Sequence, residues 1–161
     1  MSRILGTLFL LCLTTPTFAQ VTTLFPEERY KVAENVNRYP QKTPQETLKS
    51  IGNALNNKDL VYLMAWLADH KYVDKRVNQL MVKFKGGSEE ERALVAFEEL
   101  VKEISAHFEK QPSLVRELRT FVVKGKWNEK ISAFEIPGLQ SRRVFLKKDS
   151  KDRWMLQNRQ R

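Results

Sequence analysis

The chain has 161 residues, a formal net charge of +9 and a single cysteine, Cys12. This length is enough for one hydrophobic core and too short for two. One cysteine excludes an internal disulfide, and Cys12 lies in the segment that we expect to be removed. The remaining chain therefore has no thiol nucleophile, no redox pair and no cysteine metal ligand.

The first 19 residues predict a secretory signal peptide. Arg3 precedes an apolar run at residues 4–13, and the segment ends in Thr17, Phe18 and Ala19. A basic start, a short apolar stretch and a small-x-small end are typical of signal peptides. The run is too short to span a bilayer, which takes about 20 residues. We expect cleavage after Ala19, a secreted or periplasmic protein, and no transmembrane segment in the cleaved chain.

Residues 20–42 are polar, contain Pro26 and Pro40, and lack a sustained apolar period. They predict a weakly packed tether. The folded domain is expected to start at Thr43, because Thr43 and Glu46 form a capping box with Pro44 at the first helical position. The predicted organisation is thus a signal peptide at 1–19, a polar tether at 20–42 and a single domain at 43–161.

Within the domain, the apolar period changes from helical to strand spacing. Apolar residues at helical spacing predict helices at 44–56, 60–67, 72–84 and 89–109, with one short helical turn at 113–118. Alternation then predicts strands at 120–124, 130–136, 142–148 and 153–158. Helices followed by an antiparallel sheet indicate the α+β class, with N-terminal helices packed on a C-terminal curved sheet.

Two segments resemble the nuclear transport factor 2-like superfamily. One is residues 43–59, an opening helix with an Asx-rich stop, and the other is residues 143–156, a hairpin that ends in a strand with Trp154. The resemblance is one of element pattern, and it implies a cone-shaped fold in which helices and sheet enclose a pocket. The predicted helical middle, residues 72–109, is longer than is usual there. The superfamily has no common catalytic set, so the resemblance assigns no site residue.

One cluster combines aromatic rings with titratable groups around the end of the second predicted helix. Carboxylates or a histidine beside a pocket can act as general acids and bases. A structural interpretation competes with this one: the tryptophan packs in the core and the aspartates cap helices. We favour the structural interpretation. The candidate catalytic residues are Asp69, His70 and Asp74, and the candidate ligand-binding residues are Tyr62, Trp66 and Tyr72.

Positive charge is concentrated near the C-terminus. Residues 20–109 hold 13 Lys and Arg against 14 Asp and Glu, whereas residues 110–161 hold 14 against 5. Basic residues interleaved with aromatic ones can bind a polyanion, while the competing interpretation is a solvated hairpin that resists aggregation. Nucleic acid is not expected, because no such motif is present and the predicted compartment lies outside the cytoplasm. The candidate polyanion-binding residues are Arg142, Arg143, Lys147, Lys148 and Arg153.

No metal site and no cofactor is predicted. Glu103 and His107 share a helix face at i, i+4, but zinc needs three or four ligands. The chain also lacks a Gly-x-Ser-x-Gly element and a glycine-rich phosphate loop. Our first expectation is a ligand-binding or interaction module without catalytic activity. The alternatives are a small-pocket enzyme using acid/base catalysis, and an accessory protein that binds an anionic polymer or a membrane surface.

Overall fold

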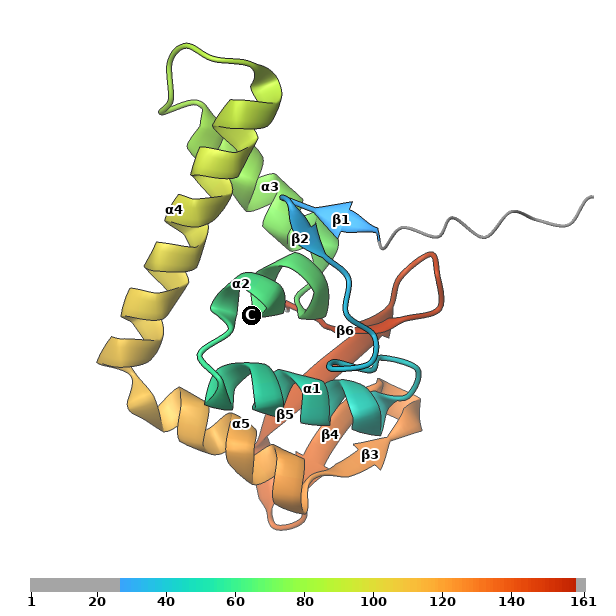
Figure 1. Cartoon of the computed structure of the whole chain (residues 1–161). Helices are drawn as coiled ribbons and strands as arrows, with labels where there is room; N and C mark the ends of the chain where they lie inside the picture. Colours follow the sequence, from blue (N-terminus) through green and yellow to red (C-terminus); the bar gives the residue numbers. More distant parts are fainter. Residues whose placement is uncertain (1–26, 159–161) are drawn as a thin grey trace, which may run out of the picture.

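The computed structural model of the chain describes residues 27–158, without the side chains of residues 139–141 (Figure 1). The predicted signal peptide, its Cys12 and residues 20–26 of the predicted tether lie outside the described residues.

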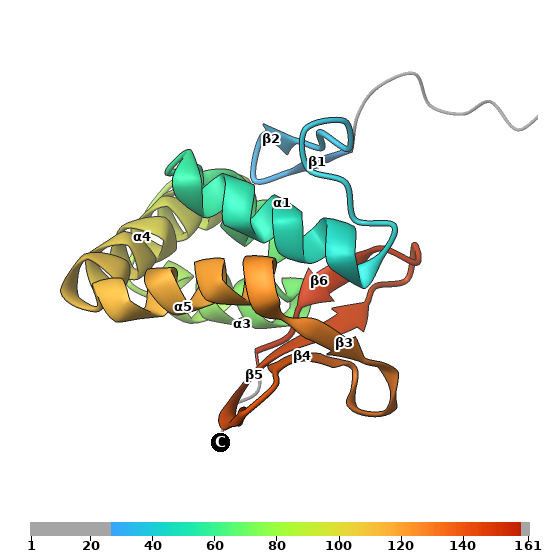
Figure 2. The same cartoon turned by 90° about the horizontal axis from the view of Figure 1, so that it is seen from below.

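The described chain belongs to the α+β class, as the sequence predicted. Helices α3 and α4 form a long hairpin that extends away from the rest of the domain (Figure 1). Helices α1 and α5 run side by side, next to the antiparallel sheet (Figure 2). The helices are α1 Pro44–Asn56, α2 Leu60–Tyr62, the π-helix η1 Leu63–Leu67, α3 His70–Met81, α4 Glu89–Lys110, α5 Pro112–Lys124 and the 3-10 helix η2 Glu129–Ile131.

Two antiparallel sheets complete the described structure. A small hairpin pairs β1 with β2, and a four-stranded sheet has the order β3-β4-β5-β6. In the larger sheet Phe134 lies opposite Val144, and Leu146 lies opposite Leu156. The strands are β1 Glu28–Arg29, β2 Val32–Ala33, β3 Lys126–Asn128, β4 Ala133–Ile136, β5 Leu139–Lys148 and β6 Trp154–Leu156.

The capping signals are confirmed. The Thr43 hydroxyl accepts from the Glu46 N–H at 3.1 Å, and the Glu46 carboxylate accepts from the Thr43 N–H at 3.0 Å. Ser88 and Glu91 form the same pair of bonds at the start of α4. Each box satisfies two backbone amides that the first helical turn leaves unpaired.

The strand predicted at residues 120–124 is wrong, because these residues belong to α5. The predicted helical turn at 113–118 is the first part of the same helix. Pro112 is the first residue of α5, where the backbone N–H would have no partner within the helix, so its absence costs nothing. Phe121 is buried, and Val122 packs against α1 at Gly52. Packing on α1 thus outweighs the strand preference of a short β-branched run.

The weak packing expected for the tether does not hold for residues 27–42. The Tyr39 side chain is 1% exposed, and its ring stacks on Tyr62 with centroids 4.3 Å apart. Tyr30 stacks on Phe97 of α4 at the same separation. The segment lacks a regular apolar period because it is a tight hairpin followed by a loop. Tyr30 and Lys31 form its turn with positive φ values of 52° and 61°.

Large side chains fill the centre of the domain. Trp66, Phe134, Leu146 and Ile51 are almost fully buried. They come from η1, β4, β5 and α1, so helices and sheet share one core. No helix of residues 27–158 has the length and apolar character needed to cross a bilayer.

Candidate functional site

The corner between η1 and α3 brings together the candidate catalytic residues, and each is held by a structural contact. Asp69 caps α3, since its Oδ1 accepts from the Lys71 N–H at 3.1 Å. The same oxygen lies 2.5 Å from the Lys147 ammonium. Asp74 lies inside α3, so the expectation that it caps a helix is wrong. Its carboxylate accepts from Arg29 at 2.6 Å and from the Tyr30 hydroxyl at 2.7 Å.

His70 is the first residue of α3 and lies edge-on to Trp66, with ring centroids 6.0 Å apart. Its Nε2 is buried and has no hydrogen-bond partner among the described residues. Burial lowers the pKa of His70, and the positive charges of Arg29 and Arg153 lower it further. The imidazole is therefore biased toward its neutral form.

The aromatic candidates do not line a common pocket. Trp66 is buried, and its indole N–H donates to the Val32 carbonyl at 3.0 Å. Tyr62 is also buried, and its hydroxyl accepts from the Asn35 N–H. Tyr72 lines a separate hollow of about 430 Å³ on the outer side of α3. The side chains of this cluster therefore have mainly structural contacts. Trp66 packs in the core and Asp69 caps a helix, as the favoured interpretation of the sequence predicted.

The five candidate polyanion-binding residues all face carboxylates. Such pairs reduce the positive charge that β5 and the turn before β6 offer to an external anion. The pairs are Arg142 with Glu117, Arg143 with Glu135 at 2.7 Å, Lys147 with Asp69 at 2.5 Å, Lys148 with Asp152 at 3.0 Å, and Arg153 with Asp149 at 2.6 Å and Glu34 at 2.7 Å.

Two of these residues also line a pocket with the segment that precedes α1. The pocket has a volume of about 400 Å³ and lies between residues 36–42 and the turn that joins β5 to β6. We call it the cationic pocket, because four of its side chains are cations and one is a carboxylate. Its lining residues are Val36, Pro40, Gln41, Lys42, Lys148, Lys151, Asp152 and Arg153.

The turn between β5 and β6 sets one wall of the cationic pocket. The Asp149 side chain accepts from the backbone N–H groups of Lys151 and Arg153 at 2.8 and 3.0 Å. Asp152 adopts a left-handed backbone with φ of 61°. Burial lowers the pKa of Arg153, but its bonds to Asp149 and Glu34 outweigh this and raise it overall. The guanidinium is thus a fixed positive charge.

Gln41 anchors the opposite wall. It is 4% exposed, and its Nε2 donates to the carbonyls of Trp66 at 3.1 Å and Trp154 at 2.8 Å. The Trp154 N–H in turn donates to the Gln41 carbonyl at 3.0 Å. These bonds fix the orientation of the amide and leave its buried Oε1 without a donor among the described residues. The wall is therefore rigid and keeps an unused hydrogen-bond acceptor.

The four cations differ in how far they are neutralised. Lys148 faces Asp152, Lys151 lies 2.6 Å from Glu27, and Arg153 pairs with three carboxylates. Lys42 is exposed and makes no ion pair with any described residue. Carboxylates thus face three of the four cations, and Lys42 is the one cation of the pocket that no carboxylate of residues 27–158 pairs with.

Sequence reasoning missed Gln41, Lys42 and Lys151 as site residues. The first two belong to the predicted tether, and nothing in their neighbours along the chain links them to the hairpin over 100 residues away. The one sequence feature that pointed to this site was the basic character of the hairpin, and it identified Lys148 and Arg153 as candidates.

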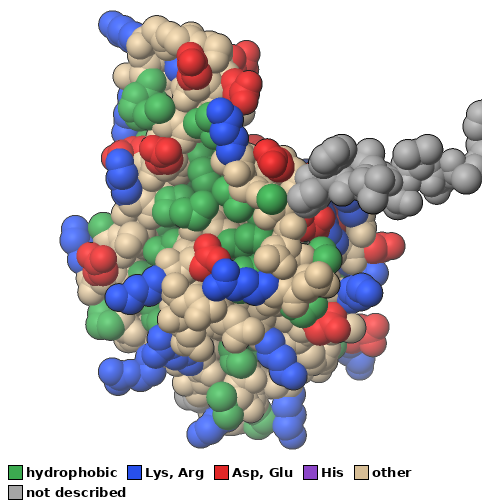
Figure 3. All heavy atoms as spheres, in the orientation of Figure 1, with side chains coloured by type: hydrophobic (Ala, Val, Ile, Leu, Met, Phe, Trp, Pro, Cys, Tyr) green, Lys and Arg blue, Asp and Glu red, His purple; other side chains and the backbone are tan. Residues whose placement is uncertain are grey.

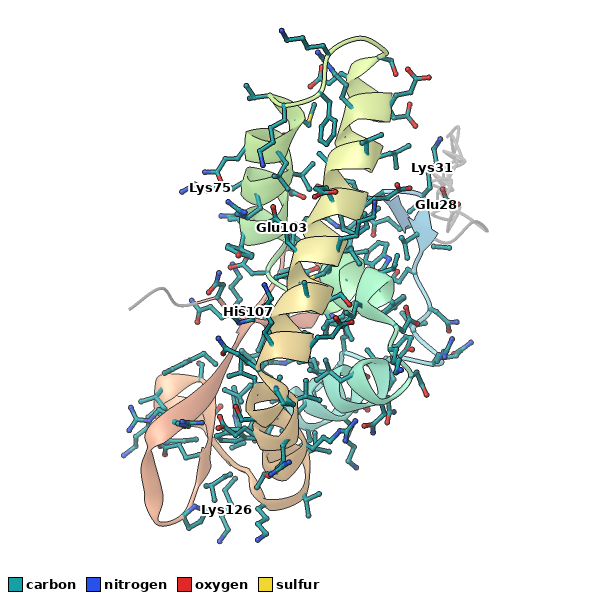
Figure 4. The ribbon with its side chains drawn as sticks, turned by 90° about the vertical axis from the view of Figure 1, so that its left-hand side faces the viewer. Glu28, Lys31, Lys75, Glu103, His107 and Lys126 are labelled. Carbon is teal, nitrogen blue, oxygen red and sulfur yellow. The ribbon has the colours of Figure 1, made fainter. Side chains whose placement is uncertain are left out.

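The described residues offer no metal centre. No three His, Cys, Asp or Glu side chains converge within residues 27–158. Glu103 and His107 lie on successive turns of α4 (Figure 4). The Glu103 carboxylate accepts from Arg76 of α3 at 3.0 Å, so it already serves to join the two helices.

Comparisons with protein-family models, curated proteins and solved structures found no match. The site is therefore interpreted from its own geometry and charge.

Proposed function

We propose that the protein is an exported ligand-binding module without catalytic activity, and that it binds a small anionic ligand in the cationic pocket. A carboxylate or phosphate group suits Lys42, with the ion-paired Lys148, Lys151 and Arg153 beside it. The observation on which the proposal rests is the exposed Lys42, which lines a pocket of about 400 Å³ and has no carboxylate partner among residues 27–158. Charge-assisted hydrogen bonds to such groups are among the strongest that side chains form.

The enzyme alternative receives less support from the geometry. Asp69 is paired with Lys147, Asp74 is paired with Arg29, and His70 is buried against Trp66. None of these three residues lines the hollow beside Tyr72 or the cationic pocket. A general base needs to lie within hydrogen-bond reach of its substrate, and these groups are turned to structural partners instead.

A cone-shaped fold of the nuclear transport factor 2-like kind is part of the same proposal. In its support, α1 contacts β6 and α5 contacts β4. Trp66, Phe134 and Leu146 are buried in the core that helices and sheet share. We therefore place the ligand at the edge of the domain and not between helices and sheet. Export rests on residues 1–19, and an intact mass that begins at Gln20 would support it, whereas a retained Met1 would refute it.

Binding can be tested by titrating citrate and inorganic phosphate into the exported chain by calorimetry. We expect Lys42→Gln to weaken binding about tenfold, because removing one charged contact costs about 1.5 kcal/mol or more. Lys49→Gln on α1 is the matched control, since Lys49 is also exposed and unpaired but does not line the pocket.

Two results would refute the proposal. One is the absence of binding by the wild-type chain at millimolar citrate or phosphate. The other is equal weakening by both substitutions, which would indicate a general charge effect in place of a defined site.

A further inference from the structure

Unpaired positive charge lies on a different element from the one that the sequence singled out. Residues 110–130 hold six Lys and Arg against two Asp and Glu. Glu117, one of the two acids, already faces Arg142 of β5. The six cations make no ion pair with any described residue, and they are Lys110, Arg116, Arg119, Lys124, Lys126 and Lys130.

Lys110 is the last residue of α4, and the other five cations are exposed residues of α5, β3 and η2. Arg116 and Arg119 are exposed at i, i+3 and therefore lie on one helix face. Lys124 ends α5, and Lys126 begins β3 two residues later. Figure 3 shows Lys and Arg side chains around the lower end of the molecule, where α5 and β3 lie, and Figure 4 places Lys126 there. We call Arg116, Arg119, Lys124, Lys126 and Lys130 the α5 basic row.

We propose that the α5 basic row binds a linear polyanion, such as a sulfated or phosphorylated polymer. A row of unpaired cations is complementary to a chain of regularly spaced anionic groups, and arginine can bind sulfate or phosphate through two parallel bonds. The proposal does not depend on the cationic pocket, which lies on another part of the domain.

A polymer fits this surface better than a membrane does. A helix that lies in a bilayer interface buries a broad apolar face among the lipids. The apolar residues of α5 are instead turned inward, with Phe121 buried and Leu118 and Val122 packed against the core. Val123, 81% exposed, is the one strongly exposed apolar side chain of α5. The surface therefore offers charge with little apolar area.

A hollow continues the row past the end of α5. It has a volume of about 620 Å³, and Lys126, Trp127 and Lys130 contribute to its lining. Glu129 and Glu135 also line it, and Glu135 is paired with Arg143 at 2.7 Å, so the hollow holds one carboxylate that no cation of residues 27–158 pairs with. One unit of a polymer bound along α5 can occupy this hollow between the two lysines.

The test measures binding of a heparin oligosaccharide across a sodium chloride series. Arg116→Gln with Arg119→Gln removes two charges from the row, and Lys83→Gln with Lys85→Gln removes two exposed, unpaired charges from the tip of the α3–α4 hairpin. We expect the first pair to weaken binding about tenfold or more at low salt. The slope of log Kd against log salt should become shallower by about 1.4, at roughly 0.7 for each lost contact.

The control pair should leave both the affinity and the slope near their wild-type values. Equal weakening by the two pairs would overturn the proposal, because binding would then follow net charge alone. Binding to phosphatidylserine vesicles without binding to heparin would also overturn it and would assign the row to a membrane. A wild-type chain that binds neither would show that the row is a solvated surface.

Discussion

His70 couples the corner between η1 and α3 to pH. Its pKa is lowered in the folded chain, first by burial and then by Arg29 and Arg153. The other charged groups that face this corner are paired: Asp69 with Lys147, and Asp149 with Arg153. As the pH falls through about 6.5, the His70 imidazole is therefore protonated in the unfolded chain while it stays neutral in the folded chain.

We accordingly expect the full contribution of His70 to the free energy of unfolding above about pH 6.5. This contribution should fall as the pH is lowered toward and through the folded-state pKa of His70. Glu27 and Asp149 have lowered pKa values, so each contributes stability that is lost only in a more acidic range. Urea unfolding between pH 7 and 5 checks this, with His70→Gln and the exposed His107→Gln compared. The His70 variant should lose much of the pH dependence. An unchanged pH dependence would mean that His70 does not titrate differently in the two states.

Residues 120–124 read as a strand in the sequence but belong to α5, because α5 packs closely against α1. A Cβ added to Gly52 of α1 would lie 2.9 Å from Cγ2 of Val122, and Val122 is stiff because it is β-branched. Overpacking costs about 1–3 kcal/mol, whereas alanine gains about 1 kcal/mol of helix propensity over glycine. Gly52→Ala should therefore destabilise the domain by about 1 kcal/mol.

The double-mutant cycle with Val122→Ala isolates this contact. In that background the added methyl has room, so Gly52→Ala should be neutral or stabilising in urea unfolding. If Gly52→Ala is equally destabilising in both backgrounds, the approach of α1 to α5 does not explain its effect.

Elements with strong local signals were predictable from the sequence, and those defined by distant contacts were not. The capping boxes at Thr43 and Ser88 specify helix starts through residues three positions apart. By contrast, α5 depends on its contact with Gly52, and Tyr39 depends on a ring more than 20 residues away. The α+β class followed from the local signals alone. The cationic pocket did not, because its two walls meet only in the folded chain.

The uneven distribution of charge along the sequence does not by itself identify a positively charged surface on the folded molecule. Strand β5 and the turn that leads to β6 carry a dense run of basic residues, yet carboxylates from α5, β4 and the 27–34 segment face them. Within residues 27–158, the exposed cations of α5 and β3 and the Lys42 side chain are among those that make no ion pair. Pairing in three dimensions, which one sequence does not reveal, decides which charges are available.

Removing residues 27–42 tests whether the domain can start at Thr43, as the sequence predicted. A chain of residues 43–161 would lose the Tyr39 ring, the Val32 carbonyl that accepts from Trp66, and Glu34, which accepts from Arg153 at 2.7 Å. Loss of one large buried aromatic side chain costs about 3–5 kcal/mol. We expect chain 43–161 to be destabilised by at least that amount relative to chain 20–161.

Urea unfolding monitored by tryptophan fluorescence measures this difference, because the truncation uncovers Trp66. The variant Tyr39→Ala in chain 20–161 separates the loss of one ring from the loss of the whole segment. It should fall between the two chains, because it keeps the contacts of Val32 and Glu34. An equal unfolding midpoint for the two chains would show that residues 27–42 rest on a domain that is already complete. In that case the walls of the cationic pocket could separate without unfolding the core, and Lys42 would no longer be held beside Lys148 and Arg153.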